Sequence, residues 1–61
     1  MDISTKRFNV ESIGGGLCSV RDRNAPYHYH TVAASDLPDM HRAAMMSESA
    51  FDRAVSDAIY A

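Results

Sequence analysis

The chain contains 61 residues, enough for one small domain and too few for a second lobe with a catalytic cleft between the two. Hydrophobic residues make up 46% of the sequence and charged residues 23%, the composition of a globular protein rather than of a disordered or disulfide-rich peptide. Six basic and eight acidic residues give a formal net charge of -2, so the protein lacks the positive field that holds nucleic acid or an anionic membrane. Length and charge therefore argue against most classes of enzyme and against binding driven by charge.

The single cysteine and the short apolar runs indicate the cellular compartment of the protein. Cys18 cannot form an internal disulfide, and no charged segment leads into an apolar stretch near Met1. The longest apolar run is far shorter than the roughly 18 residues that a membrane helix needs. These features predict a cytoplasmic protein with no membrane partner. A domain this short buries only roughly 60% of the surface of its unfolded chain, so a metal, a protein partner or self-association would add stability.

Residues 6–33 carry the pattern of an antiparallel β-meander. Phe8 and Val10 alternate with polar neighbours, the period of two that is typical of a half-buried strand. Three consecutive glycines at 14–16 predict a hairpin turn, because glycine adopts positive φ at little steric cost, and Asn24-Ala25-Pro26 predicts a second turn. Three strands are therefore expected, over residues 6–13, 17–23 and 27–33, after a flexible N-terminus at 1–5.

Residues 35–60 change to a helical period. Ser35 and Asp36 are expected to cap a helix that has Pro38 in its first turn, and Ser49 is expected to act as a further cap. The region therefore forms either one bent helix or two short helices. The sequence as a whole predicts a single α+β domain over residues 1–61, with a three-stranded antiparallel sheet and this helical region packed on one face. The expected core consists of Phe8, Val10, Tyr29, Leu37, Phe51, Val55 and Ile59.

The run Tyr27-His28-Tyr29-His30 sends its tyrosines to one face of a strand and its histidines to the other. Tyrosine brings more apolar area than histidine, so we expect the tyrosines to face the core and the histidines to face solvent. Two exposed imidazoles at this spacing can share a zinc ion, with His41 or Cys18 as a further ligand. The chain has no Cys-x-x-Cys or His-x-x-x-His pair to support such a site, so we assign no metal and no cofactor.

Catalysis and nucleic-acid binding are both disfavoured by the residues themselves. Cys18 has no evident base and orienting partner, and it is expected to be a small buried apolar residue, so no catalytic residue is assigned. The predicted hairpin brings four cations to one end of the sheet, where a tyrosine could stack on a base if the sheet were uncovered. These cations have acidic neighbours and the tyrosines are expected in the core, so nucleic acid is not the expected partner. The four cations are Lys6, Arg7, Arg21 and Arg23.

Elimination favours a non-catalytic protein-binding module that occupies a surface of a larger protein or complex. Small stand-alone domains are frequent among phage and mobile-element inhibitors of host machinery, anti-CRISPR proteins included, and the analogy is one of size alone. A small histidine-based metal-binding domain and a nucleic-acid-binding accessory protein are the alternatives, and a homo-oligomer is left open. Two patches are expected to bind the partner, one with Arg21, Arg23, His28 and His30 and the other with Met46, Asp52, Arg53 and Asp57.

We expect the fold to be independent of bound metal, because the histidines and Cys18 lack the paired spacing of zinc-binding motifs. Thermal melting followed by circular dichroism should give the same melting temperature with and without excess EDTA. A structural zinc ion contributes folding free energy directly, so a fall of about 10 °C or more in the chelated sample would contradict this expectation.

Overall fold

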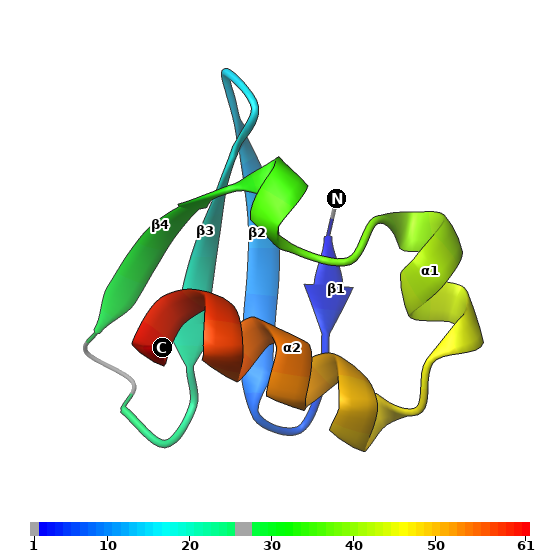
Figure 1. Ribbon diagram of the computed structural model, residues 1–61. Coiled ribbons are helices and arrows are strands. Elements are labelled where there is room, and N and C mark those ends of the chain that lie inside the picture. Colours follow the sequence, from blue (N-terminus) through cyan, green and yellow to red (C-terminus); the bar gives the residue numbers. More distant parts are fainter. Residues whose placement is uncertain (1, 26–27) are drawn as a thin grey trace.

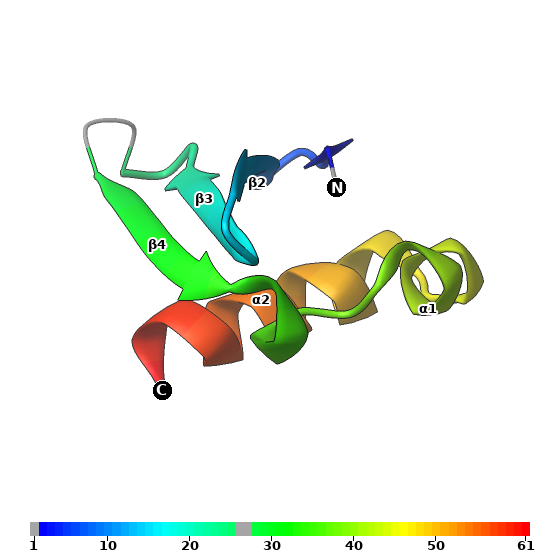
Figure 2. The ribbon, with the colours of Figure 1, turned by 90° about the horizontal axis from the view of Figure 1, so that it is seen from above.

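The computed structural model of the chain describes residues 2–25 and 28–61. Its described strands form one antiparallel sheet in the order β1-β2-β3-β4, and its helices all lie on one face of that sheet (Figures 1 and 2). This is the α+β architecture that the sequence predicts. The elements are β1 (Ile3–Ser4), β2 (Phe8–Gly14), β3 (Leu17–Asp22), β4 (Tyr29–Ala33), the 3-10 helix η1 (Ala34–Asp36), α1 (Met40–Met45) and α2 (Glu48–Tyr60).

The sheet has four strands within the described residues, and the expectation of three was wrong. The additional strand is β1, in a segment expected to be only a flexible N-terminus. Its two residues are too few to show an alternating pattern, but Ile3 pairs with Val10 and packs against the core. The Thr5 hydroxyl accepts from the Phe8 amide at 3.0 Å, and the Thr5 amide donates to the Phe8 carbonyl at 2.8 Å. This tight turn folds β1 back onto β2.

The hairpin between β2 and β3 confirms the predicted glycine turn. The φ angles of Gly14, Gly15 and Gly16 are 86°, 64° and 74°, a region that side chains with a Cβ atom rarely adopt. The pairing of the two strands shifts its register between Ser12 and Gly14, so the ribbon carries an irregularity next to the turn. The glycines therefore allow the chain to reverse direction just beyond this point.

The core lies between one face of the sheet and α2. Most of the predicted core residues are buried, and Ile59 is partly buried and packs against them. The buried ones are Phe8, Val10, Leu37, Phe51 and Val55. Cys18 is fully buried, as expected of a small apolar residue, and Val20 beside it completes the core. The inward side of the sheet therefore alternates with a period of two, as the sequence pattern indicates.

The predicted orientation of β4 was wrong. Tyr29 is 64% exposed, whereas His30 turns inward and its ring meets that of Tyr60 edge-on at 5.2 Å. Val32 lies on the same side of the strand as His30 and pairs with Cys18, which directs that side toward the core. Tyr27, expected inward with Tyr29, lies outside the described residues.

The helical half forms two α-helices in the described chain, and both caps differ from the expected ones. Leu37 is extended, as the residue before a proline prefers, so the first helix begins after Pro38 with Asp39 as its N-cap. The Asp39 carboxylate accepts from the Arg42 amide at 2.7 Å. The N-cap of α2 is Ser47 rather than Ser49, and its hydroxyl accepts from the Ala50 amide at 3.2 Å. Ser35 and Asp36 belong to η1 instead.

Replacement of Phe51 by alanine should lower the free energy of unfolding by about 3–5 kcal/mol, because this side chain is 3% exposed and lies in the centre of a small core. Urea unfolding followed by circular dichroism measures the change. The matched control is Arg53→Ala on the exposed side of the same helix, which should alter stability by less than about 0.5 kcal/mol. Equal stability of the two variants would place Phe51 outside the core.

Candidate functional site

The face of the sheet opposite the helices is left uncovered by the described elements. Figure 2 shows α1 and α2 on one side of the strands and no described element on the other. The side chains that alternate with the buried ones point to this side, and we call them the outer sheet face. The outer sheet face consists of Ser4 from β1, Asn9 and Glu11 from β2, Leu17, Ser19 and Arg21 from β3, and Tyr29 and Thr31 from β4.

Arg21 and Tyr29 are direct neighbours across β3 and β4. Tyr29 is largely exposed, and the Arg21 Nε atom is buried without a hydrogen-bond partner among the described residues. Leu17 on the same face is 42% exposed, and Ile13 is 53% exposed at the hairpin end of β2. Arginine and tyrosine are among the side chains that dominate the energy of protein interfaces, and exposed aliphatic side chains add apolar area to them. This combination makes the outer sheet face the candidate functional site.

The first predicted patch does not lie on one surface. Arg21 belongs to the outer sheet face and His28 is exposed just before β4, but His30 lies on the inner side against Tyr60. Arg23 reaches the other edge of the sheet, where its Nη2 donates to the Ser4 hydroxyl at 2.6 Å and its Nε to the Thr5 carbonyl at 3.2 Å. The expectation that His30 faces solvent was therefore wrong, and Arg21 has Tyr29 as its cross-strand neighbour instead.

The second predicted patch is also divided. Met46 is partly buried in the connection between α1 and α2, whereas the adjacent Met45 is 78% exposed. The Asp52 carboxylate accepts from the Thr5 hydroxyl at 2.7 Å, a contact that joins α2 to the turn before β2. Arg53 and Asp57 are exposed on the far side of α2. Asp52 therefore has a structural contact that the other members of the patch do not share.

A buried carboxylate that sequence reasoning missed lies at the end of β3. Asp22 is 2% exposed, and its Oδ2 atom accepts from the Tyr60 hydroxyl at 2.6 Å. The Asn24 amide donates to Oδ1 at 2.9 Å, and the Arg7 guanidinium lies 3.6 Å from Oδ2. The Tyr60 hydrogen bond is the main reason that the pKa of Asp22 is lowered, with Asn24 and Arg7 adding to it against the opposing effect of burial. The same hydrogen bond raises the pKa of Tyr60.

Three of the four predicted cations, Arg7, Arg21 and Arg23, have their backbones at one end of the sheet, since the Arg23 amide donates to the Arg7 carbonyl at 2.7 Å and Arg21 pairs with Asn9. The Arg7 guanidinium lies 4.8 Å from the centre of the Phe8 ring, close to Asp22, and so contributes to the fold. Within residues 2–25 and 28–61, no group of three or more histidine, cysteine, aspartate or glutamate side chains could hold one metal ion.

Comparisons of the chain with protein-family models, curated protein sequences and solved structures find no match. Among the described helices none combines the length and the apolar character needed to cross a membrane. The assignment of function therefore depends on the geometry of the outer sheet face.

The contact between Asp22 and Tyr60 should make stability depend on pH in two ranges. The folded-state pKa of Asp22 is lowered, so its stabilisation is present above the unfolded pKa of about 3.9 and is lost as pH falls through the folded-state pKa. The folded-state pKa of Tyr60 is raised, so its stabilisation is present below about pH 10 and is lost as pH rises through the folded-state pKa. Urea unfolding at a series of pH values measures both effects.

The Tyr60→Phe variant separates this contact from other ionisations. It should be less stable than the parent at neutral pH and should lose less stability than the parent in both ranges. Asp57→Asn changes an exposed carboxylate on the same helix, and it should retain the parent's pH dependence. Parallel pH profiles of Tyr60→Phe and the parent would show that this hydrogen bond does not cause the pH dependence of stability.

Proposed function

We propose that this protein is a non-catalytic binding module that docks its outer sheet face onto a larger protein. The observation that carries the proposal is the largely exposed Tyr29 beside the half-buried Arg21 on a sheet face that no described helix covers. An antiparallel sheet with a solvated face usually carries polar side chains there, so a largely exposed tyrosine beside an arginine departs from that pattern. Such residues form the centre of many protein interfaces.

The rest of the face supports a protein partner. Leu17 and the neighbouring Ile13 add apolar area at the hairpin end, which a nucleic-acid backbone does not require, and Glu11 places a negative charge on the same side. An interface of standard size, about 800 Å² on each partner, would cover about one fifth of the 4009 Å² surface of this chain. Binding would therefore add substantial burial to a domain whose own core is small.

We further propose that binding is reversible and stoichiometric, and that its effect is to occlude a working surface of the partner. The support for this mode of action is the small size of the chain and its analogy with compact phage and mobile-element inhibitors such as anti-CRISPR proteins. A protein of this kind needs no turnover, because each copy acts by the surface area that it covers.

Binding of single-stranded nucleic acid is a second candidate, which the exposure of Tyr29 favours. A tyrosine on an open sheet can stack on a base, a contact worth about 1–3 kcal/mol, and Arg21 lies beside it. Two of the neighbouring cations are engaged within the fold, Arg7 with Asp22 and Arg23 with Ser4. We therefore place this candidate behind a protein partner.

The first experiment replaces Tyr29 with a photo-crosslinking benzoylphenylalanine and irradiates the variant in extract of the source cells. Mass spectrometry should identify one protein crosslinked through position 29. The matched control carries the same residue in place of Arg53, which is exposed on α2 and away from the sheet face, and it should not capture that protein. Equal capture from both positions would show non-specific contact.

The second experiment measures affinity for the captured protein by calorimetry. Tyr29→Ala and Arg21→Ala should each weaken binding by more than about 1 kcal/mol, roughly fivefold or more, because each removes a central interface side chain. The melting temperature of Tyr29→Ala should stay near that of the parent, since its side chain is exposed. Asp57→Ala serves as the control and should leave the affinity unchanged. Full affinity of the Tyr29 and Arg21 double variant would exclude the outer sheet face.

A salt titration decides between the two candidate partners. Fluorescence anisotropy with labelled oligo-dT and oligo-U should show no binding by the parent at about 50 mM salt, where phosphate contacts are strongest. Binding at low salt that weakens strongly by about 200 mM and requires Tyr29 would instead assign the face to single-stranded nucleic acid.

A further inference from the structure

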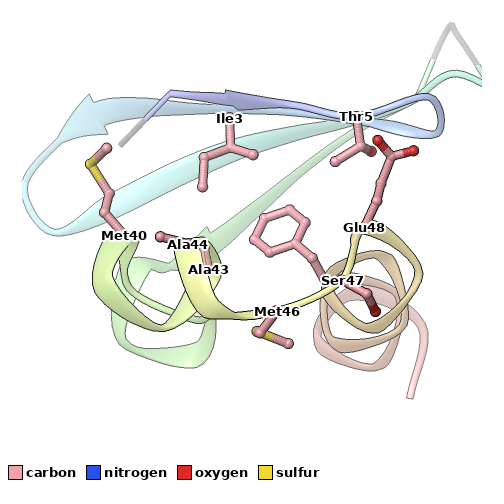
Figure 3. Close-up of a pocket in the computed structure, with 9 residues that line it drawn as sticks. Ile3, Thr5, Met40, Ala43, Ala44, Met46, Ser47 and Glu48 are labelled. Carbon is pink, nitrogen blue, oxygen red and sulfur yellow. The ribbon is translucent and has the colours of Figure 1, made fainter.

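A second surface feature lies on the helical side of the sheet, away from the outer sheet face. It is a pocket of about 350 Å³ between β1, α1 and the start of α2 (Figure 3). This volume falls at the lower end of the range for small-molecule sites. Most of its lining is apolar and comes from Ile3, Met40, Ala43, Ala44, Met46 and Phe51.

The packing around this pocket is incomplete. Helix α1 has six residues, none of them buried, and a helix of that length is not stable by itself in water. Figure 3 shows Ile3 extending from β1 toward Ala43 and Ala44 of α1. Met40 is 62% exposed at the edge of this space, and a methionine side chain adapts readily to the shape of a neighbour. An apolar group in the pocket would therefore complete the contact between α1 and β1.

The charge of the pocket is set by Glu48, which is the ionisable residue among those that line it. Its side chain extends from the first turn of α2 toward Thr5, at one end of the pocket (Figure 3). The Glu48 carboxylate has no hydrogen-bond or ion-pair partner within the described part of the chain. The nearby Thr5 hydroxyl donates to a further carboxylate, that of Asp52. This end of the pocket therefore presents negative charge beside apolar walls.

We propose that the pocket binds a small organic amine, with its apolar body against Ile3, Met40 and the alanine side chains and its ammonium group at Glu48. A charge-assisted contact with a carboxylate beside apolar surface favours such a cation over a neutral or anionic molecule of the same shape. The amide groups at the start of α2 favour the opposite charge, so a comparison of probes that differ in charge tests the proposal directly. The site is separate from the outer sheet face and does not depend on the proposed function.

The test uses three probes of nearly equal shape: 2-phenylethylamine, 2-phenylethanol and 3-phenylpropanoate. Titration of the isotope-labelled protein at neutral pH, followed by amide chemical shifts, should show the amine binding with a Kd of about 1 mM and about fivefold or more tighter than the alcohol. The carboxylate should bind most weakly. The shifts should concentrate at Ile3, Ala43 and Ala44. Each of four results would overturn the proposal. These are no amine binding up to about 10 mM, equal affinity of the three probes, a preference for the carboxylate, and amide chemical-shift changes confined to residues outside the pocket.

Two variants separate the contribution of the Glu48 charge to ligand binding from that of the pocket volume. Glu48→Gln keeps the size of the side chain and should abolish the preference for the amine while it retains weak binding of the alcohol. Ala44→Phe should fill the pocket and reduce the affinity of all three probes, whereas the control Arg53→Ala should bind them as the parent does. A preference for the amine that survives Glu48→Gln would overturn the assignment of the ammonium site. Tighter binding of the lysine peptide acetyl-Phe-Lys-amide than of 2-phenylethylamine would assign the pocket to a protein partner and overturn the small-molecule proposal.

Discussion

The packing of α2 against one face of the sheet is the interaction on which the rest of this structure depends. Phe51 and Val55 are the buried residues of that helix, and they meet the apolar side chains that β2 and β3 direct inward. A chain this short can bury one such layer and little more. Because the helix covers a single face, the opposite face of the same strands is left to solvent (Figure 2).

Two polar contacts set the position of α2 along the sheet. Near its start, Asp52 accepts from the hydroxyl of Thr5, in the turn that leads into β2. At its end, Tyr60 donates to the buried carboxylate of Asp22, which closes β3. Hydrogen bonds to a carboxylate contribute more net stability than those between neutral groups, and a buried carboxylate without its partners would be costly. The two contacts therefore favour one position of the helix among those that apolar packing alone would allow.

The same arrangement separates the two candidate binding sites. The outer sheet face carries Tyr29 and Arg21 on the strands that α2 holds from behind, so a partner would meet a rigid surface. The pocket beside Glu48 lies instead against α1, a short helix that contributes no buried residue. A rigid face suits a protein partner at low cost in conformational entropy, whereas a loosely packed helix can adjust to a small ligand. The proposed activities thus depend on parts of the fold with different degrees of packing.

The sequence by itself determined the α+β class, the hairpin turn, the helical half and most of the buried residues, because these follow from the periods of two and 3.6 and from the positive φ of glycine. It could not decide which side of β4 faces the core. The alternating pattern defines two faces of the strand but not which of them packs on the core. The pairing of Val32 with the buried Cys18 places the side of the strand that carries Val32 and His30 toward the core, and Tyr29 on the other side faces solvent. The contact between Asp22 and Tyr60 joins residues 38 positions apart, for which no local pattern exists. Only the tertiary structure brings such groups together, because long-range proximity is set by how the layers pack and not by local periodicity.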